Sequence, residues 1–432
     1  MDQLTHIGRG LLGIVGFIAI AFLFSSNRRA IPWRLVVIGV GLQILFGFLV
    51  LHVDAVRYVV DGVGNFFVRI LDFNAAGAEF LFGSLITDKK SFGYIFAFNV
   101  LPTVVFFSAL TSLLFYLGIL QKIVYAFAWI MSKTMALSGA ETLSASANIF
   151  LGQTEAPLLI KPYLPSMTSS ELLAVMVGGM ANIAGAVLVA YIGMLGGDDP
   201  AQRLLFAKHL ITASIMSAPA SLYLAKILLP QTEPVDRNLD VSRERIGANS
   251  LEAITNGTTD GIKLAVNVGG MLLVFTAMVA FLNWILAAGI GGWSGLNDFI
   301  QASTAGRYDT LSLQYIFGLL FAPVAWLMGI DYGSLTLAGQ VIGEKTVLNE
   351  FYAYGTLGKL KTDGVITDPR AILILTYALC GFANLASIGI QVGGIGTLAP
   401  NKRSELARLG VKSLIGGSLA TFIGASIAGM ML

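Results

Sequence analysis

Two glutamates, Glu155 and Glu350, stand at corresponding places in two stretches that are otherwise rich in small and polar residues. The first follows Gly152-Gln153-Thr154 and precedes Ala156-Pro157, and the second follows Asn349. Each lies in a short segment between runs that are apolar enough to cross a lipid bilayer, and we expect both segments to reach membrane depth. A carboxylate at that depth costs several kcal/mol, so it is seldom kept without a partner or a task. We therefore expect both glutamates to take part in binding a solute.

The polar side chains near the two glutamates are uncharged. Gln153 and Asn384 carry carboxamides, and Thr154 and Ser387 carry hydroxyls. These segments hold no arginine to clamp a phosphate or a carboxylate, which favours a neutral ligand. A ligand with several hydroxyls and a planar polar ring would match, because hydroxyls can donate to a carboxylate and an aromatic side chain such as Phe382 can pack on a ring.

Several of these residues also have an ordinary structural interpretation. Asn182 and Asn384 could hydrogen-bond between neighbouring helices, and Gly178 and Gly179 could allow close helix packing. Phe382 could pack without touching a ligand. Three further charged residues are expected to lie at a water interface and to be solvated: Glu141, Glu344 and Lys345.

The elements that carry these residues must be membrane helices. Of the 432 residues, 56% are apolar and only 12% are charged, which is about half the charged share of a soluble domain. An α-helix needs roughly 20 apolar residues to cross the hydrocarbon core, whereas a β-barrel would show short alternating segments. The sequence has uncharged runs of 17 or more residues at Gly10–Asn27, Leu35–Val53, Ser91–Gln121, Leu172–Gly197, His209–Ala225, Leu264–Asn297, Thr310–Ile330, Ala371–Asn401 and Ser413–Leu432.

The rest of the composition excludes several classes of protein. A net charge of +2 predicts no nucleic-acid-binding surface. The single cysteine, Cys380, allows no disulfide within the chain, and the three histidines lie far apart. No zinc, haem or other cofactor is therefore expected. Arg28 and Arg29, rather than a small-residue cleavage site, follow the first apolar run, so we expect a retained span and not a signal peptide.

Three short motifs occur twice, in the same order. In the first copy, Glu155 lies 26 positions after Trp129 and Asn182 lies 27 positions after Glu155. In the second copy, Glu350 lies 24 positions after Trp326 and Asn384 lies 34 positions after Glu350. Such long repeats are typical of secondary transporters. With the span Leu264–Ala288 between the copies, three crossings separate their starts, which predicts an inverted repeat suited to alternating access. The paired motifs are Ala128-Trp129-Ile130-Met131 with Ala325-Trp326-Leu327-Met328, Glu155 with Glu350, and Ala181-Asn182-Ile183-Ala184 with Ala383-Asn384-Leu385-Ala386.

Each copy contains a segment too short to cross the membrane twice. In Ser138–Leu164, Gly152 can end one half-helix, and Pro157 suits the first turn of the next. A carboxylate just before that turn meets the positive end of the half-helix dipole. We predict a helix–break–helix hairpin that reaches the middle of the membrane, with Gly333–Tyr354 as its counterpart in the second copy.

Each copy also contains a segment in which a membrane helix is expected to break. Glycines surround Asn182 in Val177–Gly185, and each costs roughly 1 kcal/mol relative to alanine in a helix. A break exposes carbonyls, which is tolerated at membrane depth only inside protein or toward a cavity. Gly381–Ser387 is the matching segment. The predicted fold is an all-α integral membrane protein with eight transmembrane helices, two re-entrant hairpins and an inverted internal repeat.

Three of these motifs resemble the concentrative nucleoside transporter family: Gly152-Gln153-Thr154-Glu155-Ala156-Pro157, Asn349-Glu350-Phe351 and Ala378-Leu379-Cys380-Gly381-Phe382-Ala383-Asn384. The resemblance extends from about Leu35 to the C-terminus, and the length is similar to that of the shorter bacterial members. It implies a homotrimer in the lipid bilayer with a scaffold domain and a moving transport domain. It also implies nucleosides as substrates, uridine-like ones first and purine nucleosides as a further option.

The resemblance implies a role for each hairpin. The first hairpin and the first broken helix would bind the nucleobase, and the second pair would hold the ribose. The implied base-binding residues are Gln153, Thr154 and Glu155, with Val187 as apolar lining. The implied ribose-binding residues are Glu350, Asn384 and Ser387, with Phe382 nearby.

The resemblance also implies a sodium site between the first hairpin and the first broken helix. Serines are expected at some of these positions in sodium-coupled relatives, whereas this chain has Gly178 and Asn182. An asparagine oxygen can still bind a hard cation, and proton coupling is an alternative. Gly343 stands where the first copy has Asn148, so no second ion site is expected. The implied ligands are the side chains of Asn148 and Asn182 and the carbonyls near Val177, Gly178 and Ile183.

The predicted function is a cation-coupled symporter that imports nucleosides by alternating access with an elevator-like transport domain. Sodium is the leading ion, and protons are the alternative. A membrane-embedded enzyme is a remote alternative, because the chain has no histidine pair or Asp-rich metal motif. A passive channel is equally remote, since a channel has little use for paired, inverted hairpins.

Basic connections indicate the orientation in the membrane. Asn27–Arg34, Lys226–Lys263 and Asn401–Lys412 hold 12 of the 27 Lys and Arg residues, which favours the cytoplasmic side. Both termini are then expected in the periplasm, with the protein in a bacterial inner membrane. The predicted parts are scaffold helices in 1–118, the first transport-domain repeat in 119–230, a cytoplasmic loop and a scaffold or oligomerisation span in 231–295, and the second repeat in 296–432.

Overall fold

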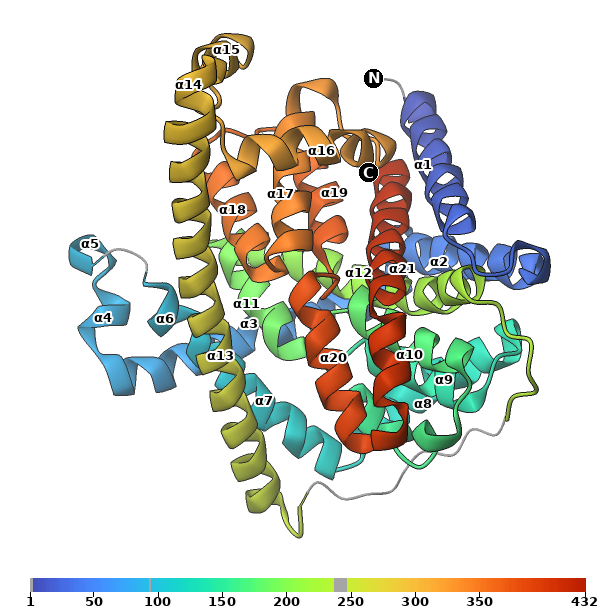
Figure 1. Ribbon diagram of the computed structural model, residues 1–432. Coiled ribbons are helices and arrows are strands. Elements are labelled where there is room, and N and C mark those ends of the chain that lie inside the picture. The colour runs from blue at the N-terminus through green and yellow to red at the C-terminus, as the bar shows by residue number, and fades with distance from the viewer. Residues whose placement is uncertain (1–2, 93–94, 237–246) are drawn as a thin grey trace.

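The computed structural model describes residues 3–92, 95–236 and 247–432. Within these ranges the chain is built of helices and contains no β-strand (Figure 1). The prediction of an all-α membrane protein is confirmed at this level. In the described part of the chain, seven helical segments are long and apolar enough to cross a membrane: Leu4–Leu23, Trp33–His52, Phe96–Tyr116, Ser169–Gly196, Pro200–Leu228, Ser250–Ser294 and Pro400–Met431.

The N-terminal part of the chain forms two apolar helices, a longer amphipathic helix and a returning span. Its elements are α1 Gln3–Leu23, η1 Arg28–Ala30, α2 Trp33–His52, α3 Asp54–Phe82, α4 Ser84–Thr87, α5 Lys89–Phe92, α6 Phe96–Asn99 and α7 Leu101–Tyr116. α3 buries one apolar face that includes Val60, Phe67 and Ile70. The short helices α4 and α5 project to one side of the molecule (Figure 1).

The first repeat contains the most deeply buried long helices in the described part of the chain. Its elements are α8 Ile119–Met135, α9 Gly139–Ala147, η2 Ala156–Ile160, η3 Leu164–Ser166, α10 Ser169–Ala181, α11 Gly185–Gly196 and α12 Pro200–Leu228. Capping boxes start α9 at Ser138 with Glu141 and α10 at Thr168 with Glu171, which satisfies main-chain N–H groups that a helix start leaves free. The 182–184 break between α10 and α11 is the predicted one, and these two helices are buried along their length.

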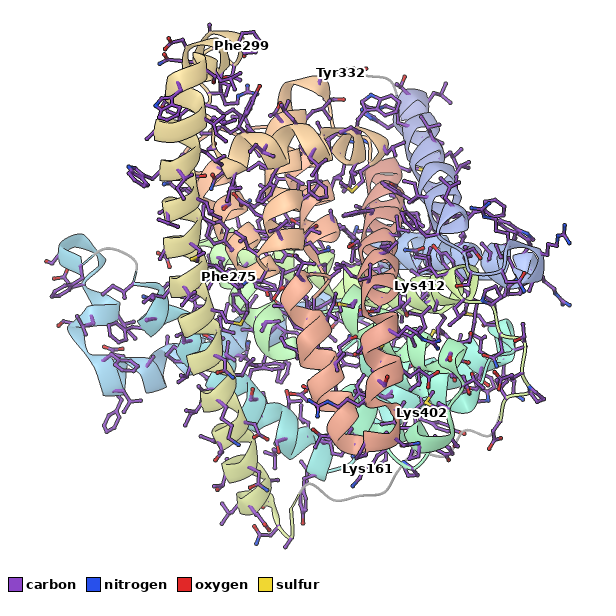
Figure 2. The ribbon with its side chains drawn as sticks, viewed as in Figure 1. Lys161, Phe275, Phe299, Tyr332, Lys402 and Lys412 are labelled. Carbon is purple, nitrogen blue, oxygen red and sulfur yellow. The ribbon has the colours of Figure 1, made fainter. Side chains whose placement is uncertain are left out.

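Along the chain, the two repeats are separated by a long helix, which runs along one side of the molecule (Figure 1). The elements here are α13 Ser250–Trp284, the π-helical turn η4 Ile285–Gly291, α14 Gly292–Ser294 and α15 Leu296–Ser303. α13 packs against α7 and is otherwise mostly exposed. Phe299 and Tyr332 lie near one end of the molecule, whereas Lys161 and Lys402 lie near the other (Figure 2).

The second repeat carries a helical hairpin and a second broken helix. Its elements are α16 Leu313–Leu327, η5 Tyr332–Ser334, α17 Leu335–Val347, α18 Glu350–Thr362, α19 Pro369–Leu379, α20 Leu385–Leu398, η6 Pro400–Lys402 and α21 Arg403–Met431. The predicted break around Asn384 is present, since 380–384 separate α19 from α20. α21 packs against α1, α10 and α19, so it holds the C-terminal repeat against the N-terminal one.

The first hairpin differs from its prediction in two respects. The half-helix α9 ends at Ala147 and not at Gly152, because the N–H groups of Ile149 and Phe150 bond three residues back, to the carbonyls of Ser146 and Ala147, instead of four. The second arm consists of 3-10 turns rather than an α-helix. Pro162 and Pro165 have no N–H to donate and interrupt α-helical hydrogen bonding there.

The prediction that three charged residues are solvated is wrong. Glu141 and Glu344 are each 1% exposed and Lys345 is 0% exposed. Glu141 forms a buried ion pair with Lys226, and Glu344 accepts a hydrogen bond from Gln340 Nε2 at 3.0 Å. These charges can be buried because groups on other turns or helices compensate them, which sequence position alone does not reveal.

Candidate functional site

The carboxylate of Glu350 lies where the two repeats meet. Asn349 caps α18 by accepting the N–H of Tyr352 at 2.8 Å, so Glu350 lies in the first turn at the positive end of the helix. Glu350 is buried, and each carboxylate oxygen has its own donor. Tyr191 Oη from α11 donates to Oε1 at 3.0 Å, and Asn384 Nδ2 donates to Oε2 at 3.0 Å. One side chain thereby contacts both copies.

A chain of hydrogen bonds continues from Asn384 to the tip of the first hairpin. Asn384 is the N-cap of α20, and its Oδ1 accepts the N–H of Ser387 at 2.9 Å. The Ser387 Oγ accepts from Gln153 Nε2 at 3.2 Å. The other amide atom, Gln153 Oε1, is buried without a partner among the described residues. The structure thus brings Glu350, Asn384, Ser387 and Gln153 together and leaves one acceptor free.

Glu155 is placed differently from Glu350. Its side chain is exposed to a pocket bounded by the first hairpin, the start of α11, and the helices α7 and α13. Ser112 of α7 and Asp260 of α13 line the same pocket. Thr154 beside it is also exposed, and its methyl group fills the space that Gly394 leaves by having no Cβ. Glu155 therefore lies in an open pocket between these elements, outside the Glu350 chain.

Phe382 and Val187 lie next to this chain of hydrogen bonds. Phe382 is in the second break, partly exposed, two residues before Asn384. Val187 is buried in the first turn of α11, one helical turn before Tyr191 and on the same face. Both are placed to supply apolar surface beside polar groups.

Two of the predicted cation ligands, Asn148 and Asn182, carry buried side-chain oxygens that no hydrogen bond among the described residues uses; these two atoms are called the oxygen cluster below. Asn148 Nδ2 donates to the Ser144 carbonyl at 2.9 Å, and Asn182 Nδ2 donates to the Gly178 carbonyl at 3.3 Å. Both side-chain oxygens, Oδ1 of Asn148 and Oδ1 of Asn182, are buried with no donor in the described part of the chain. Unpaired buried oxygens are costly and are the ligand type that hard cations take. Val177 and Ile183, on either side, are fully buried.

The absence of a transition-metal site is a separate finding. Among the described residues, no group of three or more His, Cys, Asp or Glu side chains is arranged to hold a metal ion.

Two functional candidates escaped the sequence analysis. Tyr191 binds Glu350, but it lies in an unbroken apolar run that gives no local signal. Gln391 is buried on α20, and its Nε2 donates to the Met176 carbonyl of α10 at 2.9 Å. A Cβ at Gly179 would lie 2.6 Å from Gln391 Nε2, so the glycine makes room for it. The i, i+4, i+7 spacing of Ser387, Gln391 and Gly394 marks one face of α20 and could have indicated this residue.

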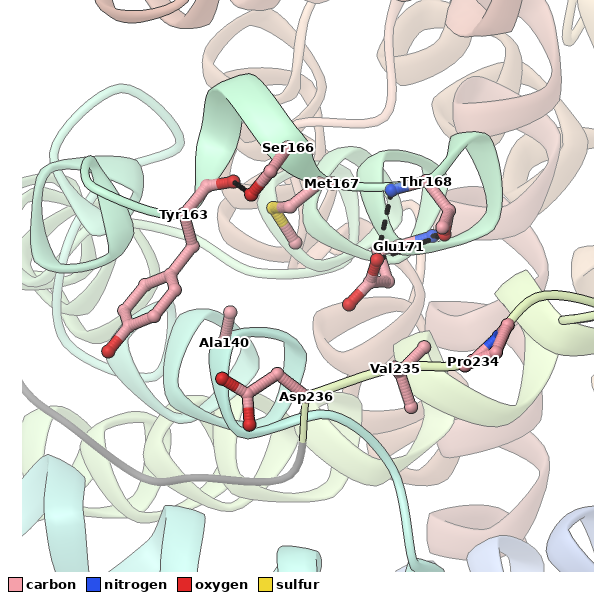
Figure 3. Close-up of a pocket in the computed structure, with 9 residues that line it drawn as sticks. All are labelled: Ala140, Tyr163, Ser166, Met167, Thr168, Glu171, Pro234, Val235 and Asp236. Atoms are coloured by element: carbon pink, nitrogen blue, oxygen red, sulfur yellow. Dashed lines mark hydrogen bonds between the residues drawn. The ribbon is translucent and has the colours of Figure 1, made fainter.

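A further pocket lies at the start of α10, away from these residues (Figure 3). Glu171 and Thr168 are its polar groups on α10, and their side chains bond to each other's main chains at 2.9 and 3.3 Å as a helix cap. Asp236 and Tyr163 line the opposite side. Because its acidic group on α10 serves the capping box, this pocket is explained by local structure.

Family models cover most of the chain. Residues 12–85 match the model for the N-terminus of Na+ dependent nucleoside transporters, and residues 209–429 match the model for their C-terminus. Residues 97–198 match the model described as nucleoside recognition.

Curated relatives match over nearly the whole length. An uncharacterized transporter of Haemophilus influenzae is 43% identical over 98% of this chain and 97% of its own. The nucleoside permease NupC of Helicobacter pylori is 40% identical with the same coverage of both chains, 98% and 97%. Human solute carrier family 28 member 3 is 39% identical over 100% of this chain, which spans 60% of the human protein.

Solved structures match equally well. CNTnw in an inward-facing substrate-bound state is 38% identical, with a TM-score of 0.89 over 99% of this chain and 98% of that chain. A variant of CNTnw in an outward-facing state is 37% identical, with a TM-score of 0.90 over 99% of both chains. The chain therefore belongs to the family of Na+ dependent, concentrative nucleoside transporters, which are membrane transporters and not enzymes.

Proposed function

We propose that this protein is a sodium-coupled symporter that imports nucleosides by alternating access. One observation carries the proposal: the buried Glu350 carboxylate accepts hydrogen bonds from both repeats and begins a chain of bonds that reaches Gln153. A site shared by two copies can open to either side of the membrane as the copies move relative to other helices.

The chemistry of the site fits a nucleoside. A carboxylate such as that of Glu350 can accept from vicinal ribose hydroxyls, and these bonds are stronger than neutral ones because one partner is charged. The free Oε1 of Gln153 can accept from an N–H of the base, and Thr154 and Glu155 extend that side of the site. Phe382 and Val187 offer apolar surface for the rings. Uridine has all the matching groups, and purine nucleosides share them.

The oxygen cluster supports sodium as the coupling ion. Asn148 and Asn182 each direct an unpaired amide oxygen into the interior next to the first break, and Na+ would satisfy both. Bound there, the ion would hold the first hairpin against α10, close to Gln153. Solute and ion would then raise each other's affinity by the same factor.

Proton coupling is the second candidate, and two observations favour it. Gly178 offers no side-chain oxygen at the cation position, which leaves fewer ligands for sodium. Glu155 shares its pocket with Asp260, and two nearby carboxylates can hold a proton between them. Glu155 would in that case be the proton-carrying group.

The finer architecture belongs to the same proposal. The segments around α9 and around α17 and α18 would be re-entrant hairpins in a molecule of eight transmembrane helices. Residues 119–230 and 296–432 would supply the moving transport domain, and 1–118 and 231–295 the scaffold. The end of the molecule at which Lys161 and Lys402 lie would face the cytoplasm of a bacterial cell. Both termini would then be on the periplasmic side.

An exposed apolar surface supports a homotrimer. A groove beside α13 and α7 is lined mainly by apolar side chains, among them Leu101, Val105, Ile262 and Val266. Apolar surface between helices is covered in a membrane by lipid or by another copy, and close helix packing favours the latter where small residues are present. Gly270 of α13 is such a residue, because a Cβ there would meet no atom of this chain within 4 Å. The mass of the purified protein in detergent, measured by light scattering, tests the trimer.

Uptake into proteoliposomes tests the function. We expect labelled uridine to accumulate above equilibrium when sodium is present outside at fixed pH, and to stop accumulating when choline replaces sodium. Accumulation that follows the pH gradient and ignores sodium would select the proton alternative. Uptake that never exceeds equilibrium under either gradient would refute coupled transport.

A further inference from the structure

A fully buried lysine lies beside the second break without a carboxylate bound to it. Lys345 is 0% exposed, and its Nζ donates to the Ala378 carbonyl at 2.8 Å and to Thr421 Oγ1 at 3.1 Å. The ammonium also lies 5.6 Å from the ring centre of Phe422. Within the described residues it forms no ion pair. Burying an ammonium in this way costs several kcal/mol unless the surroundings favour a positive charge.

The surroundings of Lys345 offset part of the cost of burying a positive charge. Lys345 is in the last turn of α17, and Ala378 is in the last turn of α19. The carbonyl end of each half-helix carries partial negative charge, and cations at such ends are stabilised. Glu350, five residues farther along, adds an electrostatic attraction. The ammonium thus occupies a position that two helix ends and a carboxylate make attractive for any cation.

The first repeat has the same pair of helix ends but no lysine. Asn148 caps the end of α9, and Gly178 lies in the last turn of α10. The two are in contact, since a Cβ at Gly178 would lie 3.1 Å from Asn148 Nδ2. The candidate cation ligands there are the unpaired side-chain oxygens of Asn148 and Asn182. Where the first repeat offers free oxygens, the second repeat offers oxygens already bonded to an ammonium.

We propose that the Lys345 ammonium is a tethered cation that occupies the second repeat's counterpart of the ion position. The proposal rests on the proposed function, since it takes the oxygen cluster of the first repeat as an ion site. It explains how two inverted copies can share one architecture while only one of them needs an ion from solution. The charge of Lys345 keeps α17 joined to α19, and so positions Glu350 and Asn384, whether or not sodium is present.

Substitutions that separate charge from hydrogen bonding test this role. Lys345→Gln keeps a donor for Ala378 and Thr421 but removes the charge, and Lys345→Arg keeps the charge. Uridine binding to the purified full-length protein is measured by calorimetry in sodium, ammonium and choline chloride at one ionic strength. Lys226→Gln is the matched control, because Lys226 is equally buried but is paired with Glu141.

We expect Lys345→Gln to bind uridine at least about tenfold more weakly than the wild type in choline, the loss of one buried charge interaction. Sodium or ammonium should restore most of that affinity, and the sodium dependence should become steeper. Lys345→Arg should stay close to the wild type. The uridine affinity of Lys226→Gln should be the same in ammonium chloride as in choline chloride.

Two results would overturn the proposal. One is wild-type affinity of Lys345→Gln in every salt, and the other is a loss that small cations relieve no better than choline does. A variant that folds only with sodium or ammonium counts as rescue, and one that misfolds in all three salts counts as a failure to rescue. If wild-type binding ignores sodium, the sodium proposal fails, while the ammonium comparison still decides the role of Lys345.

Discussion

The main-chain N–H of Phe382 donates a hydrogen bond to the main-chain carbonyl of Asn182 at 3.2 Å. The two residues lie in the breaks of the two broken helices, 182–184 and 380–384. A broken helix leaves carbonyls and N–H groups without partners in the membrane interior, and here one break supplies a donor for the other. The breaks therefore stabilise each other, and residues from both copies are brought to one place.

Gly381 allows this contact, and its substitution should separate the two breaks. A Cβ on Gly381 would lie 2.7 Å from the Met180 carbonyl oxygen and 2.9 Å from Thr421 Cγ2. Both distances are shorter than the contacts that Cβ atoms make with other atoms in proteins. We expect Gly381→Ala to lower the rate of uridine uptake strongly. Gly389→Ala on α20 is the matched control, because a Cβ there meets no atom within 4 Å. Equal uptake by the two variants would show that the contact between the breaks is dispensable.

Glu350→Gln tests the central carboxylate. An amide at this position presents an NH2 group to either Tyr191 Oη or Asn384 Nδ2, both of which are donors in the structure. Disrupting a buried, hydrogen-bonded charge costs about 3 kcal/mol, so uridine affinity should fall by about a hundredfold. Calorimetric titration of the purified variant measures it.

Glu344→Gln is the control for that substitution. Glu344 is a buried glutamate on the same hairpin, but its hydrogen bond to Gln340 lies within α17. We expect it to keep uridine affinity within a few-fold of the wild type. Normal binding by Glu350→Gln would remove Glu350 from the site, whatever the control does.

Tyr191→Phe tests a residue found only in the structure. The hydroxyl holds Glu350 Oε1 at 3.0 Å, and a hydrogen bond to a charged group contributes about 1.5 kcal/mol or more. Affinity for uridine should fall by about tenfold, with little change in melting temperature. Tyr354→Phe is the control, since Tyr354 stacks on Tyr191 but donates to the Thr376 carbonyl. An equal or larger loss in the control would mean that the loss of any buried hydroxyl in this region, and not of the bond to Glu350, lowers the affinity.

The sequence predicted the breaks and the four linked residues because each has a local signal. Glycines beside Asn182 and Asn384 weaken a helix wherever they occur, and a lone glutamate in an apolar run is conspicuous. Tyr191 has no such signal, because its partner Glu350 is 159 residues away and its own helix is apolar on every face. Lys345 was misplaced for a related reason, since its stabilising groups, Ala378 and Thr421, belong to helices that only folding brings near.

The 3-10 arm of the first hairpin shows a different limit. Pro157 was correctly placed in a first turn, but Pro162 and Pro165 follow too closely for any α-helix to form between them. The two segments therefore differ in secondary structure, although Glu155 and Glu350 take corresponding positions in the two sets of motifs.

Asn148→Ala tests the ion position of the first repeat. The substitution removes one unpaired oxygen next to Asn182, and if that contact is worth about 1.4 kcal/mol, sodium binds about tenfold more weakly. The sodium concentration for half-maximal uptake should rise accordingly, while the maximal rate at saturating sodium recovers. Asn74→Ala is the matched control, because Asn74 is buried and bonded to Thr103 at 2.9 Å and belongs to neither broken helix. An unchanged sodium dependence in Asn148→Ala, together with a shifted pH dependence, would assign the coupling to protons at Glu155 instead.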